Sequence, residues 1–312
     1  SATTSLALCL EVLKIKPDDE VIVSDFSFPA TANVVENIGA VPIFADVDLK
    51  TYNMLPEDLE KKISSKTKAV IFVDALGNPS KIHEISAICK KHNIPLIEDA
   101  ACALGSSEYG VKNGNIADLT CFSFHPRKLL TTGEGGAVTT NDPSYADEIE
   151  TKLNHGAIFK EGKFQFITSG FNYRMTEMQA IMGIEGLKKL DKNIEIRNII
   201  KSKYIKALSE LGFIPQWKHN NSFHNVQSVI FTVPPGINRD KLIHHLKTKG
   251  IESTLGTYCL SNTSYYKSKY NDIQPNSKFL EENTITLPCY RGVNTRKIIK
   301  TISKYVFAET YS

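Results

Sequence analysis

The sequence lacks the features that mark membrane, metal-binding and nucleic-acid-binding proteins. No apolar run approaches the roughly 20 residues needed to span a bilayer, and no signal peptide opens the chain. The six cysteines show neither CxxC pairs nor the spacing of metal ligands. Acidic and basic residues are interspersed and leave a net charge of +3, without a basic stripe interleaved with aromatics. We therefore expect a cytoplasmic protein with reduced thiols, no metal, and no membrane or nucleic-acid partner.

The chain also lacks a methionine at its start. Ser1 to Thr4 run directly into the apolar periodicity of Leu6, Leu8 and Leu10, so a helix is expected almost from the first residue. This pattern predicts that an N-terminal segment of the protein is missing from the chain.

Short apolar runs alternate with helical patterns over the first two thirds of the sequence. Strands are expected at 20–24, 41–46, 69–73, 95–99, 119–124 and 136–140. Helices are expected at 4–13, 30–38, 56–62, 82–92, 145–153 and 176–208. This alternation predicts an α/β fold whose mostly parallel sheet is covered by helices on both faces. In such sheets, ligands bind outside the carboxyl ends of the strands.

The long helical stretch at 176–208 is expected to link this domain to a second one. Pro215 and the polar run 218–222 mark a change in composition. A strand pattern at 226–233 and helical patterns at 239–247 and 295–308 follow. The sequence of 312 residues, 41% of them hydrophobic, is long enough for two cores. We predict a large domain at 1–205 and a small C-terminal α+β domain at 206–312.

Two residues with complementary chemistry fall at the expected ligand edge of the sheet. Lys128 closes the segment Ser-Phe-His-Pro-Arg-Lys after one strand, and Asp99 ends another. A lysine can carry an aldehyde cofactor as a Schiff base, and an acidic residue can hold a pyridine nitrogen protonated. Taken singly, a lysine is usually a solvated charge and an aspartate at a strand end is usually a turn residue. Their combination favours a site for pyridoxal 5′-phosphate (PLP).

The phosphate of such a cofactor needs hydrogen-bond donors and a helix N-terminus. Thr3 and Thr4, at the start of the first helix, offer hydroxyl and backbone N–H groups, and Ser123 offers a further hydroxyl. A Ser/Thr pair at a helix start is more often a plain N-cap, and that alternative stays open. Glycines at 133, 135 and 136 let the backbone turn tightly out of the lysine loop.

Several motifs in order carry a resemblance to a known family. They are Ala-Thr-Thr at 2–4, Asp-Phe-Ser-Phe-Pro-Ala-Thr-Ala-Asn at 25–33, Ile-Glu-Asp-Ala-Ala at 97–101, the serine-to-lysine segment with its Gly-Glu-Gly-Gly tail at 123–136, Asn-His-Gly at 154–156 and Gly-Phe-Asn-Tyr-Arg-Met at 170–175. With them, the chain resembles the DegT/DnrJ/StrS family of PLP-dependent nucleotide-sugar aminotransferases, of the fold type I class of aspartate aminotransferase. The resemblance implies a large domain with a mostly parallel sheet flanked by helices and a small C-terminal α+β domain.

The resemblance also implies roles for individual residues. Lys128 would form the internal aldimine and move a proton between the amino donor and the cofactor, and Asp99 would pair with the pyridine nitrogen. Arg127, beside the lysine, is either a candidate for substrate anions or a surface residue.

Further residues are implied to contact the cofactor. Phe28 would lie against its face, although a core phenylalanine is an equal alternative. Cys102 stands where the family commonly has His or Gln, and a thiol is a weaker hydrogen-bond partner. Asn172 matches an asparagine that reaches the phosphate in the neighbouring subunit, which implies a homodimer with shared active sites. The implied cofactor-binding set is Thr3, Thr4, Phe28, Asp99, Cys102, Ser123, Lys128 and Asn172.

By resemblance, the function is a ping-pong transamination from an amino donor such as L-glutamate to a keto group of a nucleotide-linked sugar, in amino-sugar and polysaccharide biosynthesis. Gly256-Thr257-Tyr258 resembles a family segment near the sugar site, but a histidine often found shortly afterwards is absent. One alternative is sugar dehydration on the same fold, which Lys128 argues against because the dehydratase relative has histidine there. Amination of an inositol-type ketone and a non-enzymatic role as a PLP-fold sensor or scaffold are the others.

Overall fold

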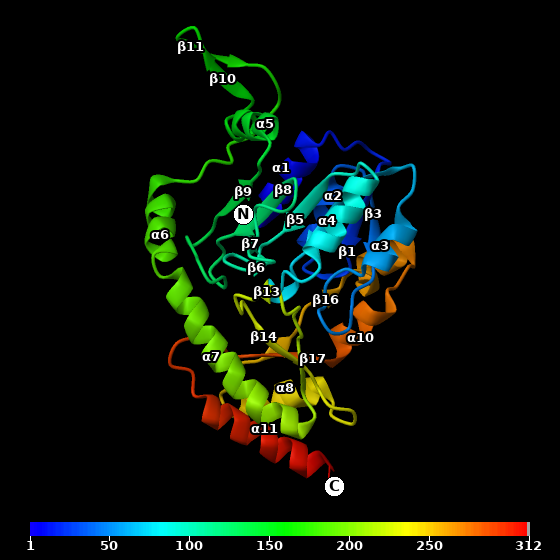
Figure 1. Cartoon of the computed structure of the whole chain (residues 1–312), viewed down its shortest axis with the longest axis vertical. Helices are drawn as coiled ribbons and strands as arrows, with labels where there is room; N and C mark the ends of the chain where they lie inside the picture. Colours follow the sequence, from blue (N-terminus) through cyan, green and yellow to red (C-terminus); the bar gives the residue numbers. More distant parts are fainter. Residues whose placement is uncertain (311–312) are drawn as a thin grey trace.

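The structure is a computed structural model that describes residues 1–310 of the chain. Its centre is a six-stranded sheet in the order β3-β1-β4-β5-β8-β9 (Figure 1). The strands are β1 (Glu20–Ser24), β3 (Val41–Ala45), β4 (Thr67–Val73), β5 (Leu96–Asp99), β8 (Leu119–Ser123) and β9 (Gly136–Thr139). All neighbours pair in parallel except β8 and β9, which are antiparallel. The predicted mostly parallel sheet is thus confirmed, and each predicted strand lies within three residues of its expected bounds.

Helices cover both faces of this sheet because its strands are apolar on both sides. Val21 and Val23 point into a core formed with α1 and α2, whereas Ile22, between them, points into a core formed with α3 and α4. The covering helices are α1 (Ala2–Val12), α2 (Ala30–Asn37), α3 (Pro56–Lys62), α4 (Ile82–Lys91) and α5 (Pro143–Leu153). The parallel strands therefore all end at one edge, between the helical layers.

The expected single helix at 176–208 is wrong, because the structure has two helices there, α6 (Glu177–Leu187) and α7 (Leu190–Leu208). The two helices pack against different surfaces. Gly186 of α6 lies against Leu130 of the lysine loop, while Leu190 and Ile194 of α7 lie against Gly105. The chain changes direction between these surfaces at Lys188 and Lys189, as Figure 1 shows.

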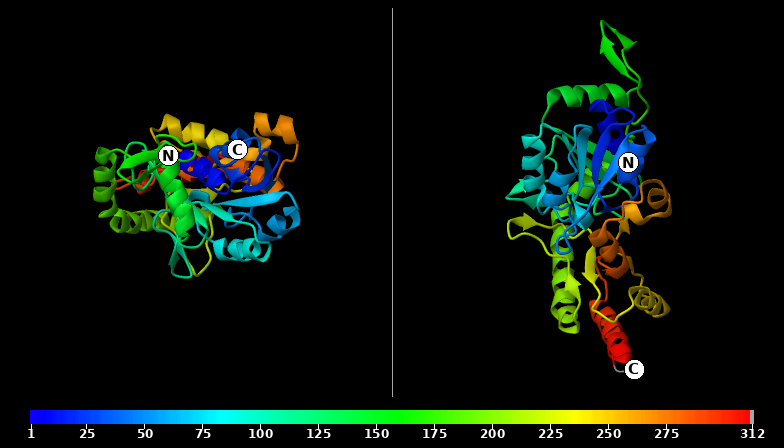
Figure 2. Two further views of the ribbon diagram at one scale, coloured as in Figure 1. Left: turned by 90° about the horizontal axis from the view of Figure 1, so that it is seen from above. Right: turned by 90° about the vertical axis from the view of Figure 1, so that its right-hand side faces the viewer.

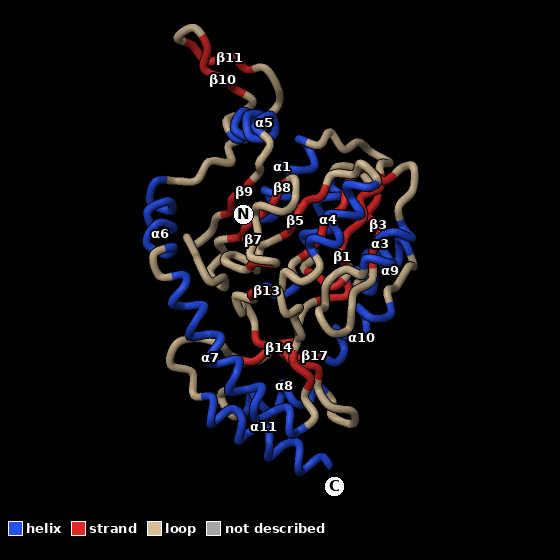
Figure 3. The backbone as a smooth tube through the Cα atoms, viewed as in Figure 1, coloured by secondary structure: helices blue, strands red, loops and turns tan. Residues whose placement is uncertain are grey.

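A second, four-stranded sheet lies towards the C-terminus, in the order β12-β14-β17-β15. Its strands are β12 (Ile214–Pro215), β14 (Val229–Thr232), β15 (Thr254–Leu255) and β17 (Thr284–Leu287). It shares a hydrophobic core with α7, α8 (Arg239–Thr248) and α11 (Thr295–Thr310), which surround it in Figure 3. The α+β character expected after residue 206 is present. The division at 205 and 206 stays a prediction, and α7 runs across it.

Smaller elements tie the C-terminal part to the first sheet. They are β2 (Phe26–Ser27), β6 (Ser107–Glu108), β7 (Val111–Lys112), β13 (Ser222–Phe223), β16 (Tyr258–Cys259), α9 (Ser264–Tyr270), α10 (Pro275–Asn283) and three short 3₁₀ turns at 75–77, 209–211 and 260–262. β16 pairs with β2, and β13 pairs with β6. Both pairs bring residues after 220 against the edge of the large sheet.

A β-hairpin projects away from the rest of the molecule. It consists of β10 (Ala157–Lys160) and β11 (Lys163–Phe166), and it lies at the end opposite the C-terminus (Figure 2). Among residues 1–310, none of the helices is both long enough and apolar enough to cross a membrane.

Candidate active site

Lys128 and Asp99 come from neighbouring parallel strands. Asp99 is the last residue of β5 and stands beside Cys121 of β8 in the register. Lys128 follows the end of β8 by a short turn, in which its backbone N–H donates to the His125 carbonyl. Because both strands end at the same edge, the two side chains lie in one region of the molecule.

The Asp99 carboxylate is buried and held by two donors. Its Oδ2 accepts a hydrogen bond from the Thr31 hydroxyl at 3.0 Å, and its Oδ1 accepts from the backbone N–H of Ala101 at 3.2 Å. Thr31 in turn contacts the Ser27 hydroxyl at 2.9 Å. Burial raises the pKa of Asp99 above its ordinary value, although these donors and the Lys128 charge act against burial. Asp99 therefore lacks a full counter-charge.

Lys128 is held by a sulfur atom. Its Nζ donates to Cys102 Sγ at 3.0 Å. Burial acts to lower the pKa of Lys128, but the Cys102 sulfur and the Asp99 carboxylate outweigh it, so the pKa lies above its ordinary value. Lys128 and Asp99 form no direct ion pair, although each shifts the pKa of the other. The amine is thus held as an ammonium, at a distance from the carboxylate.

These residues fit the two ends of a PLP ring. A protonated ring nitrogen would supply the counter-charge that buried Asp99 lacks, and it would cancel part of the field that keeps Lys128 protonated. The glycine turn fits the phosphate end, because Gly136 packs directly on the start of α1. A Cβ on Gly136 would lie only 2.7 Å from the Ser1 carbonyl carbon and 3.0 Å from the Ala2 nitrogen. Only glycine lets the lysine loop approach this helix N-terminus.

The hydroxyls predicted for the phosphate differ in their surroundings. Thr3 is exposed. The Thr4 hydroxyl donates to the Ser1 carbonyl at 2.8 Å, and Ser1 Oγ accepts from the Thr4 N–H, so Thr4 takes part in a capping box. Ser123 is partly exposed, and its oxygen accepts from the His125 N–H at 3.4 Å. For Thr4, the N-cap alternative describes the arrangement.

Phe28 is not part of the core. Its side chain is 60% exposed and its ring lies 6.4 Å from that of Tyr258, which reaches it through the pairing of β16 with β2. Asn172 is also exposed, and a β-bridge joins it to Asn154 beyond α5. Within residues 1–310, no hydrogen bond links Asn172 to Lys128 or Asp99.

A pair of buried carboxyl groups lies next to the site. Glu98 precedes Asp99 on β5, and Asp74 follows β4. The Asn113 amide donates to Asp74 Oδ2 at 2.7 Å and to Glu98 Oε1 at 2.5 Å. Burial raises the pKa of both carboxyl groups, and the Glu98 charge raises that of Asp74 further. Among residues 1–310, no lysine, arginine or histidine forms an ion pair with either carboxyl group, so the pair keeps a proton that single carboxyl groups would lose.

Sequence reasoning assigned no role to three residues that hold these side chains. Thr31 lies in the motif at 25–33 and hydrogen-bonds Asp99. Asn225 and Gln227, from the loop before β14, hydrogen-bond the backbone of both functional loops. The sequence did give a reason to consider Thr31, because it follows Phe28, a predicted cofactor contact, by about one helical turn in the same motif. Nothing near residues 225–227 marked them.

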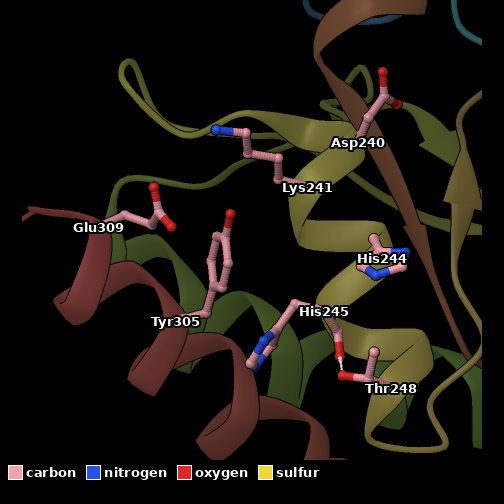
Figure 4. Close-up of a pocket in the computed structure, with 7 residues that line it drawn as sticks. All are labelled: Asp240, Lys241, His244, His245, Thr248, Tyr305 and Glu309. Atoms are coloured by element: carbon pink, nitrogen blue, oxygen red, sulfur yellow. Dashed lines mark hydrogen bonds between the residues drawn. The ribbon is translucent and has the colours of Figure 1, made fainter.

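A separate groove lies between α8 and α11. It has a volume of about 510 Å³ and is lined by Asp240, Lys241, His244, His245, Thr248, Tyr305 and Glu309, which Figure 4 shows. The Tyr305 and His245 rings lie 4.9 Å apart along one wall. None of the residues predicted to bind the cofactor lines this groove, so it is not the candidate active site.

Comparison with known proteins identifies relatives over nearly the whole chain. A model of the DegT/DnrJ/EryC1/StrS aminotransferase family matches residues 1–305. The uncharacterised protein MJ1066 of Methanocaldococcus jannaschii is 35% identical over 97% of this chain and 83% of its own length.

Solved structures of two other proteins are also similar. Spr1654 from Streptococcus pneumoniae, assigned as a sugar aminotransferase, superposes in its PMP-form with a TM-score of 0.93, at 27% identity over 99% of this chain and 87% of its own. Its PLP-form gives the same TM-score at 28% identity. Helicobacter pylori PseC, an aminotransferase involved in the biosynthesis of pseudoaminic acid, gives a TM-score of 0.92 at 26% identity, over 99% of this chain and 85% of its own.

Proposed function

Since the chain belongs to the DegT/DnrJ/EryC1/StrS aminotransferase family, we propose that it moves an amino group from L-glutamate to the keto group of a nucleotide-linked sugar. Membership makes the protein a PLP-dependent aminotransferase with a fold type I architecture. The observation that carries the proposal is the placement of Lys128 and Asp99 at one sheet edge, each within the other's field but without a direct ion pair.

The residues of this chain would divide the work as follows. When bound, PLP supplies the stabilisation of negative charge at the reacting carbon. Asp99, fixed by Thr31 and Ala101, would hold a proton on the ring nitrogen. The backbone N–H groups at the start of α1, together with Thr3 and Ser123, would bind the phosphate.

Lys128 would act as the general base through its Nζ. To do so it must give up the proton that Cys102 and Asp99 stabilise, and neutralising Asp99 lowers that barrier. Cys102 Sγ, 3.0 Å from Nζ, would keep the amine oriented while the amine is not bonded to the cofactor. Arg127 is exposed beside the lysine, where it would meet the negative charge of a nucleotide diphosphate. Phe28 and Tyr258 offer exposed aromatic rings.

Spectroscopy and product analysis test this proposal separately. The purified protein with PLP should be yellow, and L-glutamate should convert its visible absorbance band to that of the pyridoxamine form. The visible band of bound PLP should reappear when a nucleotide-linked keto-sugar is added. Mass spectrometry should then show the aminated product. A yellow protein that ignores glutamate would refute the donor, whereas one that accepts glutamate but aminates only inositol-type ketones would refute the sugar substrate. A protein that ignores PLP would favour the scaffold alternative.

We also propose that the protein is a homodimer joined through the projecting hairpin and α6. Phe159, Phe164 and Phe166 of the hairpin are 67%, 69% and 72% exposed. None of the residues of α6 is buried, although Met178 and Ile181 are apolar. An apolar surface of this extent favours burial against another protein, and the exposed Asn172 lies between its two parts in the sequence.

Light scattering measures the oligomeric state directly. We expect a dimer for the unaltered chain and a monomer for the double substitution Phe159→Glu and Phe164→Glu. Phe279→Glu is the matched control, because Phe279 is an exposed phenylalanine on α10, outside this surface. A monomer for the unaltered chain would contradict the proposal, as would a dimer that persists in the double variant.

A further inference from the structure

The loop between β13 and β14 contains a strained and completely buried residue. Val226 has a φ of +60° and none of its surface is exposed. This backbone conformation is a rare outlier for a β-branched side chain, and it costs on the order of 1–3 kcal/mol. Such strain persists only where the surrounding structure enforces it. The contacts of residues 224–227 should therefore show what enforces this conformation.

Those contacts hold the strained turn from several sides. Arg197 of α7 donates to the carbonyls of Val226 and Gln227, at 2.7 and 2.5 Å. His224 Nδ1 accepts from the Val226 N–H at 2.7 Å, which requires a neutral imidazole, and burial lowers the pKa of His224 well below its usual value. Asn225 Oδ1 accepts from the Gln227 N–H at 2.9 Å. These contacts therefore fix the directions in which the side-chain amides of Asn225 and Gln227 leave the turn.

The Gln227 side chain binds the lysine loop on both sides of Lys128. Its Oε1 accepts from the Leu129 N–H at 3.0 Å, and its Nε2 donates to the Arg127 carbonyl at 2.8 Å. One amide thus fixes the two peptide groups that flank Lys128. No other side chain outside the loop bonds these two backbone atoms among residues 1–310.

The Asn225 side chain binds the loop that follows Asp99. Its Nδ2 donates to the carbonyls of Cys102 and Leu104, at 2.8 and 3.0 Å. Gly77 leaves room for this contact, because a Cβ there would lie 2.2 Å from Asn225 Oδ1 and 2.8 Å from the Cys102 carbonyl oxygen. Cys102 is also the residue whose sulfur accepts from Lys128.

We propose that Asn225, Val226 and Gln227 form a positioning clamp that sets the spacing between the Lys128 amine and the Asp99 carboxylate. The strained Val226 stands between two residues with amide side chains. Asn225 binds the loop that follows Asp99, and Gln227 binds the lysine loop. The strain at Val226 is what turns the two side chains towards different loops. The clamp side chains bind backbone atoms of the two loops, so these are positioning residues and act through the backbone.

The test compares two glutamines that lose equivalent bonds. In Gln227→Leu the lysine loop loses both amide contacts, and we expect about tenfold weaker PLP binding, as two lost hydrogen bonds imply. We also expect a slower half-reaction with glutamate and a shifted pH at which the absorbance of bound PLP changes. Gln274→Leu is the control, because the Gln274 side chain accepts from Lys62 Nζ at 2.7 Å and donates to the Asp272 carbonyl at 2.8 Å, and among residues 1–310 it hydrogen-bonds neither the lysine loop nor residues 224–227. The control should lose unfolding stability to a similar extent but keep PLP affinity and the pH-dependent absorbance unchanged.

Equal PLP affinity and equal absorbance behaviour in Gln227→Leu and the unaltered protein would overturn the proposal. So would equal losses of PLP affinity in Gln227→Leu and Gln274→Leu, because the effect would then follow stability alone. If Gln227→Leu does not fold, Gln227→Glu decides, since it keeps the acceptor for Leu129, loses the donor to Arg127 and adds one negative charge. We expect about threefold weaker PLP binding in Gln227→Glu, and unaltered affinity would refute the clamp.

Discussion

Replacement of Asp25 by asparagine should change how the stability of the protein depends on pH. Asp25 follows β1, none of its surface is exposed, and no cation pairs with it among residues 1–310. Its Oδ1 accepts from the Ser261 N–H at 2.7 Å, and its Oδ2 accepts from the Ser261 hydroxyl at 2.8 Å and from Cys259 Sγ at 3.1 Å. These bonds fasten the segment that carries Tyr258 to the β2 side of the site.

The size of the effect follows from the pKa of Asp25. Burial raises this pKa from 3.8 to about 6, although the donors on Ser261 and Cys259 act against burial. A folded-state pKa above the unfolded one means that the folded protein binds a proton more tightly. This part of the stability is therefore present at low pH and is lost as the pH rises through about 6. Between pH 7 and about 4.5, the native protein should gain about 2 kcal/mol from Asp25.

Urea unfolding at several pH values measures this gain as a difference. Asparagine keeps an acceptor for the Ser261 N–H but does not titrate, so Asp25→Asn should lack the gain. The free energy of unfolding of the unaltered protein, minus that of the variant, should rise by about 2 kcal/mol as the pH falls across that range. A difference that stays constant from pH 7 to about 4.5 would refute the reasoning, because Asp25 would then titrate alike in the folded and unfolded chain.

Three other substitutions test the site itself. Lys128→Ala should slow the half-reaction with glutamate by at least about a hundredfold in stopped-flow absorbance, while equilibrium unfolding in urea should give an unaltered midpoint. Unaltered turnover would remove the lysine from its role. Thr31→Val should weaken PLP binding about tenfold because Asp99 loses a donor, whereas Thr31→Ser should restore it; a PLP titration in which both variants match the native protein would count against this arrangement. Asp74→Asn should make stability less sensitive to rising pH, since the raised pKa values of Asp74 and Glu98 mean that the native protein loses stability as the pH rises through them. If the free energies of unfolding of Asp74→Asn and of the unaltered protein change with pH in parallel up to pH 9, Asp74 and Glu98 do not share a buried proton.

Sequence reasoning predicted the candidate site through the rule for parallel strands. Asp99 and Lys128 each follow a predicted strand, and neighbouring parallel strands place such residues at one edge whatever the loop details are. The local preference for a capping box accounts for the position of Thr4 no less well than the hypothesis that Thr4 binds the phosphate. These inferences depend on short stretches of chain, where local preferences dominate.

Contacts set by tertiary packing could not be read from the sequence in the same way. The break between α6 and α7 arises because Gly186 of α6 and Leu190 and Ile194 of α7 lie against different surfaces, and the helical periodicity continues through it. Gln227 is a polar residue in an unremarkable loop until the fold places it beside Leu129. The contact of Cys102 with Lys128 likewise depends on the relative height of two loops.

The origin of the clamp late in the chain affects the order in which the protein matures. Gln227 is 98 residues away from Leu129 along the chain, so the ribosome adds it about 5–20 s after the lysine loop has been made. During that interval the nascent large sheet has its lysine but not the partner that fixes it. If the clamp acts as proposed, efficient capture of the cofactor has to wait until Gln227 has been made and its loop has packed against the lysine loop.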